Sequence, residues 1–264
     1  MSEAFYVDAG DHFAPTELTR GPWDAGSQHA GPPAALLGRA LERCEPRDGM
    51  EVARVTYEIL GPVPIAPLRV GARVIRPGRS VELLEAELRE DGGRPLVRAT
   101  AWRIRTTRLE LPADMPQREH EPPPGPEAGE PPAFFEVGYD VGYHTAMDVR
   151  VVAGAGFAEP GPGTVWMRPR VAIVEGEAPS PLQRVLVAAD SGNGVSAVLD
   201  HRRWLFINCE LTVHLHRLPA GEWVCVDAET IAEPHGIGMA EAVLWDERGR
   251  IGRSAQSLLI GERG

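Results

Sequence analysis

Lysine is absent from this chain, and all 27 basic residues are arginine. Without lysine, the chain cannot carry the G-x-x-x-x-G-K-[ST] loop that cradles nucleotide phosphates. The G-x-S-x-G motif of serine hydrolases is also missing. No apolar run approaches the ~20 residues that cross a bilayer, and the N-terminal residues show no basic region followed by an apolar one. We therefore expect neither a membrane span nor a signal peptide.

Cysteine is scarce, because the chain has only three and no C-x-x-C pair. An odd count without a motif argues against a disulfide framework and favours a reducing compartment. The net charge of −11 disfavours nucleic acid or an acidic membrane as a partner. The 264 residues, 43% of them apolar, suffice for one large core or two ordinary ones. We expect a cytoplasmic protein that binds neither nucleic acid nor membranes.

One segment interrupts the apolar patterning near the middle of the chain. It reads LPADMPQREHEPPPGPEAGEPP, and proline and glutamate dominate it. Such a composition is typical of an extended linker. It divides the chain into an N-terminal unit (1–110), the linker (111–132) and a C-terminal unit (133–264).

The two units repeat one pattern. Thr56 is followed after 35 positions by the turn sequence DGGR at Asp91, and Thr212 is followed after 34 positions by DERGR at Asp246. Glycine in these turns supplies the positive φ that hairpins need. The segments between are rich in Val, Ile, Leu and Thr, as in strands. We expect each threonine to open an equivalent strand of its unit.

Each unit also has one helix before its strands. Pro32–Pro33 leads AALLGRALERC, and prolines are tolerated in a first helical turn. Ser180–Gln183 reads SPLQ, which is a capping-box start. That helix should run to about Asp190, with Gly192 and Gly194 stopping it. A helix and an antiparallel meander, twice, predict an α+β fold in which each sheet wraps its own helix.

Five segments, taken in order, resemble the double-hotdog thioesterase-like proteins, the group that contains the type II acyl-CoA thioesterases. They are GPWDAGSQHAGPPAALLGRALE, VIRPGRSVELLEAEL, AADSGNG, FINCELTVHLHRLPAGEW and GRSAQSLLI. One departure is Ala30, where the family usually has His-Gly-Gly before the first helix. The resemblance implies two fused hotdog repeats and hydrolysis of an acyl thioester, with acyl-CoA as the expected substrate. It also implies a homodimer or larger homo-oligomer, and no cofactor is expected.

The resemblance also implies the catalytic residues. Type II thioesterases use an Asp on the second helix, a Thr or Ser opening the next strand, and a Gln on the last strand. These positions fall on Asp190, Asn208 and Gln256. Asn208 departs from the family's Thr, but an amide still donates and accepts hydrogen bonds and could orient a water molecule. Strand alternation places Asn208 on one face with Glu210 and Thr212, unless it only caps the strand end.

The residues themselves support two of these assignments. Asp190 ends an apolar helix, where partial desolvation suits a general base; alternatively, it only bonds the backbone of the Ser-Gly-Asn-Gly loop. Gln256 shares a strand face with Ser254 and Leu258, where an unpaired amide would be costly; alternatively, it is a structural glutamine bonded to backbone. Its counterpart in the first unit is Ala101, so we expect the site in the second unit alone.

His29 and Gly31 form a candidate substrate-binding element. They precede a helix N-terminus, whose backbone N–H groups could receive a thioester oxyanion. The alternative is a tight entry turn with no chemical role. His214 and His216 have the spacing of metal ligands on a strand, but no third ligand converges visibly, so no metal site is expected.

Two other functions remain open at this point. A hotdog hydratase shares the fold and acyl-CoA substrates, although its Asp-x-Asn-Pro-x-His stretch is missing here. An acyl-CoA-binding or assembly protein could keep the fold without catalysis, and Asn208 in place of Thr favours that alternative.

Overall fold

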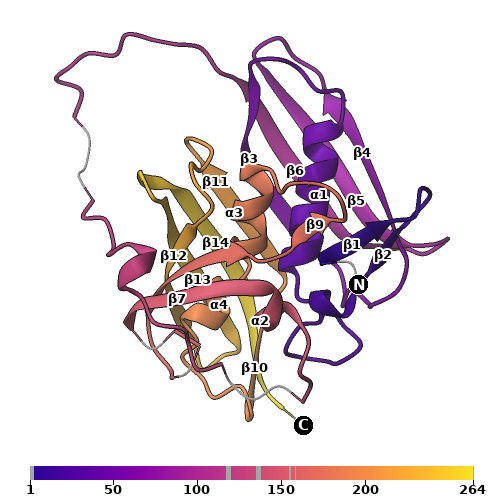
Figure 1. Ribbon diagram of the computed structural model, residues 1–264, viewed down its shortest axis with the longest axis vertical. Coiled ribbons are helices and arrows are strands. Elements are labelled where there is room, and N and C mark those ends of the chain that lie inside the picture. Colours follow the sequence, from indigo (N-terminus) through magenta and orange to yellow (C-terminus); the bar gives the residue numbers. More distant parts are fainter. Residues whose placement is uncertain (1–2, 117–119, 135–137, 155, 158, 264) are drawn as a thin grey trace.

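The computed structural model describes residues 3–116, 120–134, 138–154, 156–157 and 159–263. Antiparallel strands dominate, and two helices of 13 and 9 residues are the longest in this part of the chain (Figure 1). In chain order the elements are β1 (Ala4–Asp8), β2 (Phe13–Pro15), η1 (Glu17–Thr19), α1 (Gly31–Arg43), β3 (Met50–Ile59), β4 (Leu68–Arg76), β5 (Val81–Glu90), β6 (Pro95–Arg105), η2 (Pro126–Ala128), α2 (Tyr143–Ala146), β7 (Met147–Gly154), β8 (Gly163–Pro169), β9 (Ala172–Val174), α3 (Pro181–Ala189), α4 (Gly192–Val195), β10 (Trp204–Asn208), β11 (Glu210–Leu215), β12 (Val224–Ala232), β13 (Ile237–Asp246) and β14 (Gly249–Glu262).

One continuous sheet runs through both halves of the molecule. Among the described residues its order is β7-β8-β12-β13-β14-β11-β3-β6-β5-β4-β2-β1-β9, and β10 also pairs with β14. The hairpin turns predicted at Asp91 and Asp246 join β5 to β6 and β13 to β14, and Gly92 and Gly249 have φ values of +66° and +127° there. The fold is the expected α+β double hotdog.

The two halves meet where β3 pairs with β11. Thr56 and Thr212 are register partners across this junction, and their Oγ1 atoms lie 3.2 Å apart. The repeat is therefore a structural one, with equivalent threonines at its centre. The prediction that both open their strands is wrong, because Thr56 lies well inside β3 and Thr212 is the third residue of β11.

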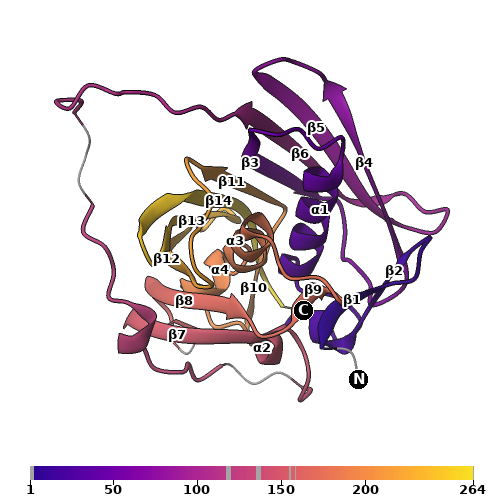
Figure 2. The same cartoon turned by 45° about the horizontal axis from the view of Figure 1, so that its top comes forward.

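Each of the two long helices lies against its own half of the sheet. α1 packs on β4 and β5, and α3 packs on β8 and β12, inside the curve of the second half (Figure 2). The helices also pack on each other, and Gly38 allows this because a Cβ there would come within 2.4 Å of Leu186 Cδ1. Buried side chains from both halves form one shared core.

The helix ends agree only partly with expectation. The Ser180 Oγ accepts a hydrogen bond from the Gln183 N–H at 3.1 Å, but the Gln183 side chain reaches Glu42 rather than closing the capping box. α3 ends at Ala189 as expected. Gly192 and Gly194 do not stop helical structure, however, because they belong to the short helix α4. A tight helical turn thus follows Asp190 directly.

The later part of the Pro/Glu-rich segment contacts the second half. The Trp166 indole N–H donates to the Pro124 carbonyl at 2.7 Å, and Glu130 bridges to Val151. The division into 1–110, 111–132 and 133–264 stays a prediction; β9, from the last of these ranges, pairs with β1 of the first. None of the described helices is long and apolar enough to cross a membrane.

Candidate active site

Asp190 stands at the C-terminal end of α3, between the two halves. The apolar run before it is buried against the sheet, and Asp190 itself is only 4% exposed. A buried carboxylate is costly unless hydrogen bonds satisfy it. Its partners therefore decide what it can do.

Asn208 is the first partner. Its Nδ2 donates to Asp190 Oδ1 at 2.9 Å. Its side chain points inward because the pairing with β14 shifts by one residue between β10 and β11. Asn208 pairs with Leu258, and Thr212, four positions later, pairs with Ala255, which is only three positions away from Leu258. Such a bulge re-aims the side chains on one side of it. The expectation that Asn208 shares a face with Glu210 and Thr212 is therefore wrong.

Gln256 is the second partner, but it contacts the backbone of Asp190 rather than the carboxylate. Its Nε2 donates to the Asp190 carbonyl at 3.1 Å, and its Oε1 accepts from the Asn193 N–H at 3.0 Å. The side chain is 1% exposed. Both ends of the amide thus hold the turn that follows α3 in place.

His29 is the third partner, and it comes from the first half. Its Nδ1 lies 3.0 Å from Asp190 Oδ2 and also 3.0 Å from the Gly31 nitrogen at the start of α1. One ring nitrogen cannot donate to the first and accept from the second at once. An ionised carboxylate only accepts, so with Asp190 charged the Nδ1 carries the proton and the Gly31 N–H is left for another acceptor.

Gly31 is required sterically as well. A Cβ at this position would come within 2.5 Å of the Val187 carbonyl oxygen, which belongs to α3. The backbone of α1 can therefore approach the end of α3 only because this residue has no side chain. At the preceding position Ala30 is accommodated as the N-cap residue of α1.

Tyr143 and Ser191 complete the surroundings of His29, and the sequence did not point to either. The Tyr143 ring stacks on the His29 ring with centroids 3.8 Å apart and planes 7° apart. Its hydroxyl donates to the Val187 carbonyl at 2.7 Å and lies 3.0 Å from Ser191 Oγ. Tyr143 follows the Pro/Glu-rich segment, where no periodic pattern marks a buried residue.

Burial sets the protonation of this group of residues. It lowers the pKa of His29, and the nearby charge of Asp190 offsets this only in part. Burial raises the pKa of Tyr143 far above its usual range, so the phenol stays neutral. The imidazole of His29 and the phenol of Tyr143 are therefore both uncharged at neutral pH.

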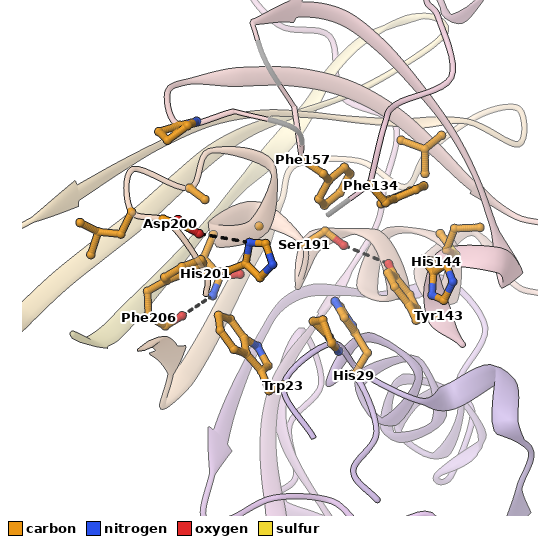
Figure 3. A pocket seen from close by; sticks show the side chains of 18 of the residues that line it. Trp23, His29, Phe134, Tyr143, His144, Phe157, Ser191, Asp200, His201 and Phe206 are labelled. Atoms are coloured by element: carbon orange, nitrogen blue, oxygen red, sulfur yellow. Dashed lines mark hydrogen bonds and ion pairs between the residues drawn. The ribbon is translucent and has the colours of Figure 1, made fainter. Parts of the chain in front are cut away.

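A cavity of about 310 Å³ begins at this group (Figure 3). His29, Ser191 and Asn193 are among the residues that line it, whereas Asp190, Asn208 and Gln256 are not. Asp190 contacts His29, and Gln256 accepts from the Asn193 N–H. A second, much smaller cavity of about 10 Å³ touches Asp190 and Ala30. That volume holds about one water molecule.

No metal site accompanies these cavities in the described part of the chain, where no three His, Cys, Asp or Glu side chains come together. His214 and His216 lie on β11 and just beyond it, apart from Asp190.

Comparison with known families agrees with this architecture over most of the chain. Residues 19–104 match the family described as Acyl-CoA thioesterase N-terminal domain, and residues 112–260 match Acyl-CoA thioesterase C-terminal domain. The chain belongs to the acyl-CoA thioesterase family. It is thus a thioesterase enzyme, as the resemblance of its motifs implied.

Solved structures show the same fold as this acyl-CoA thioesterase. A hot dog fold protein of unknown function from Alicyclobacillus acidocaldarius is 17% identical, with 98% of this chain and 96% of that chain covered and a TM-score of 0.70. The acyl-CoA thioesterase II TesB2 from Mycobacterium marinum is 14% identical, with 90% and 91% covered and a TM-score of 0.65. The tesB protein of Mycobacterium avium subspecies paratuberculosis is 16% identical, with 97% and 95% covered and a TM-score of 0.59. A search of curated proteins finds no match.

Proposed function

We propose that this acyl-CoA thioesterase hydrolyses its substrate with a water molecule activated by Asp190. The observation that carries the proposal is the convergence of Asn208, Gln256 and His29 on one buried aspartate at the end of α3. Three separate segments meet there, and the sequence had singled out all four residues for chemistry.

The Asp190 carboxylate is held in place by hydrogen bonds but can still accept further ones. Asp190 Oδ1 accepts from Asn208 and Oδ2 faces His29, and each carboxylate oxygen has a second lone pair. A water molecule bonded to Asp190 can therefore pass it a proton as its oxygen attacks the thioester carbonyl. The C–S bond then breaks, the thiolate takes up the proton from Asp190, and the free acid and thiol leave.

His29 and Gly31 stabilise the oxyanion that develops on the thioester carbonyl oxygen. With Nδ1 of His29 donating to Asp190, the Gly31 N–H at the start of α1 can donate to the developing oxyanion. Gln256 acts as a positioning residue, because its amide fixes the Asp190 carbonyl and the Asn193 N–H. The acyl group would extend from this point into the 310 Å³ cavity.

The test measures thiol release from a panel of acyl-CoA thioesters with a thiol reagent. Asp190→Asn should lower kcat by ~10²–10⁴, the usual contribution of a general base, with little change in melting temperature because the two side chains are nearly isosteric. Glu42→Gln is the matched control. Glu42 lies near the end of α1 and accepts from Ser180 at 2.7 Å, so it is the corresponding acid of the first half.

Each outcome separates the proposal from its rivals. Full turnover by Asp190→Asn at an unchanged melting temperature removes the carboxylate from the mechanism. Loss of turnover by Glu42→Gln alone would move the site to the first half. Hydration without thiol release would identify a hydratase, and saturable binding without turnover an acyl-CoA-binding protein.

We also propose a cytoplasmic homodimer or larger homo-oligomer. Cys44, Cys209 and Cys225 are all free thiols, which agrees with a reducing compartment. Large apolar side chains are exposed on the outer face of the sheet, among them Ile237 and Leu259 at 60% and 59%. Contact with a second copy would cover them.

A further inference from the structure

The lining of the large cavity is unusual for this chain. Phe, Tyr and Trp make up 6% of the sequence, or 16 residues. Five of them are among the 22 described residues that line the cavity, together with two of the six methionines. Branched aliphatic side chains are nearly missing from this lining, which in the described residues includes only Val149 and Leu199. The composition differs from that of a general apolar core.

The rings face the cavity from several sides. Phe134 and Phe157 lie together on one side, with ring centroids 5.0 Å apart. Trp23 and Phe206 lie on the opposite side in Figure 3, in an edge-to-face contact of 4.9 Å. The stacked rings of His29 and Tyr143 form the end nearest Asp190.

A cavity lined by aromatic rings and methionines binds an aromatic ring more favourably than an alkyl chain. Aromatic pairs in offset or edge-to-face geometry gain free energy beyond the burial of apolar area, and the sulfur atoms of Met147 and Met167 also favour contact with ring edges. An alkyl chain gains only its burial. Each ring–ring contact corresponds to a factor of roughly 2 to 12 in binding.

We propose that the cavity selects arylacyl thioesters, which carry a phenyl ring close to the thioester carbonyl, over alkyl thioesters of the same carbon number. This inference rests on the proposed hydrolysis and names its substrate class. The acyl carbonyl lies at His29 and Asp190, and the ring lies between the Phe134–Phe157 pair and the Trp23–Phe206 pair.

The first experiment compares substrates of equal carbon number. The kcat/KM of phenylacetyl-CoA is measured against that of octanoyl-CoA, and 3-phenylpropionyl-CoA against nonanoyl-CoA. We expect the aryl member of each pair to be favoured by about tenfold, as one or two ring–ring contacts provide. Equal or higher values for the alkyl members would overturn the inference.

The second experiment removes one ring. Phe157→Leu should bring the aryl-to-alkyl ratio down by about the contribution of one ring contact, ~2- to 12-fold. Trp23→Leu, on the opposite wall, is the second variant if the first unfolds. Phe13→Leu makes the same chemical change on β2, outside the cavity lining, and should leave the ratio unaltered. An unaltered ratio in both cavity variants would contradict the assignment.

The third experiment separates this inference from the proposed function. Binding of phenylacetyl-CoA and octanoyl-CoA to Asp190→Asn is measured by calorimetry, where no hydrolysis is needed. Tighter binding of the aryl thioester supports the inference even if the wild type hydrolyses neither. Equal affinities overturn it even if both are hydrolysed.

Discussion

In the proposed mechanism, the Nδ1 atom of His29 links the general base Asp190 to the Gly31 N–H that receives the oxyanion. While the imidazole is neutral, Nδ1–H faces Asp190 and the carboxylate keeps its basicity. As the pH falls through the pKa of His29, the ring becomes a cation beside Asp190 at 3.0 Å and makes that carboxylate a poorer base. In this mechanism, proton uptake by His29 would oppose catalysis.

The pH profile of kcat should show this. Burial lowers the pKa of His29 from its ordinary value of 6.5, so the fall in kcat that accompanies protonation of His29 should have its midpoint below pH 6.5. His29→Gln, which cannot titrate, should have a lower kcat and lack this part of the acid limb. An acid limb that is the same in both proteins would show that another group titrates.

The loss of Gln256 should show the effect of positioning Asp190 separately from the effect of proton transfer. Gln256→Ala leaves the buried Asp190 carbonyl and Asn193 N–H without their partner, at a cost of about 1–3 kcal/mol for each unsatisfied group. We expect kcat to fall ~10-fold or more as Asp190 loses its position, together with a lower melting temperature. Ser254→Ala, on the same buried face of β14, is the control for truncation alone. A reduced kcat with an unchanged melting temperature would instead favour direct contact of Gln256 with the substrate.

Single residues differ in how far the sequence could predict them. Asp190 and Gln256 stood out because each is a polar side chain in an apolar run, where it needs partners. The sequence could not tell that Gln256 would bond the backbone and Asn208 the carboxylate, since that depends on how three segments meet. Tyr143 had no signal at all, because its partners lie more than 40 positions away in the chain.

At the level of elements, a bulge decides which way Asn208 points. The same shift occurs in the first half, where Val52 pairs with Arg103 but Arg54 pairs with Trp102. Simple alternation could not reveal it, because one extra residue exchanges the two faces of a strand. By contrast, the register confirms that Ala101 corresponds to Gln256. Thr56 pairs with Thr100, the residue before Ala101, and Thr212 pairs with Ala255, the residue before Gln256.

The approach of α1 to α3 gives a prediction of its own. In Gly31→Ala the new Cβ would meet the Val187 carbonyl oxygen at 2.5 Å, and a backbone atom cannot yield as a flexible side chain can. The start of α1 should shift away from α3 and carry His29 off Asp190. We expect kcat to fall at least ~10-fold, together with a loss of stability of about 1–3 kcal/mol from overpacking.

Gly71→Ala is the control for Gly31→Ala in denaturant unfolding and turnover assays. Nothing lies within 4 Å of a Cβ at Gly71, and like Gly31 it has no positive φ, so that variant adds the same methyl group without a clash. If Gly31→Ala keeps wild-type kcat, close approach of the two helices is not needed for the site.

At the level of the whole molecule, the repeat builds two helix-end junctions, and we propose that one of them is the active site. The start of α1 meets the end of α3 at His29 and Asp190, and the end of α1 meets the start of α3 at Glu42 and Ser180. The repeat and its turns could be read from the sequence because they are local. Which junction borders the cavity of about 310 Å³ depends on the packing of both halves, and no local pattern in the sequence specifies that packing.

The outer face of the sheet carries exposed apolar side chains that the proposed homo-oligomer would cover. Leu259 pairs with Ile237 on one side and with Ile207 on the other, so the three exposed side chains are neighbours on β13, β14 and β10. Contiguous apolar surface of this kind is rare on monomers and marks interaction sites.

If a second copy covers this apolar surface, Leu259→Arg should lower the mass measured by light scattering at micromolar concentration. Leu109→Arg changes an equally exposed leucine, at 67%, away from this face and should leave the mass unaltered. A wild-type protein that is already monomeric under these conditions would contradict the assembly, and a mass unaffected by Leu259→Arg would place the contact elsewhere.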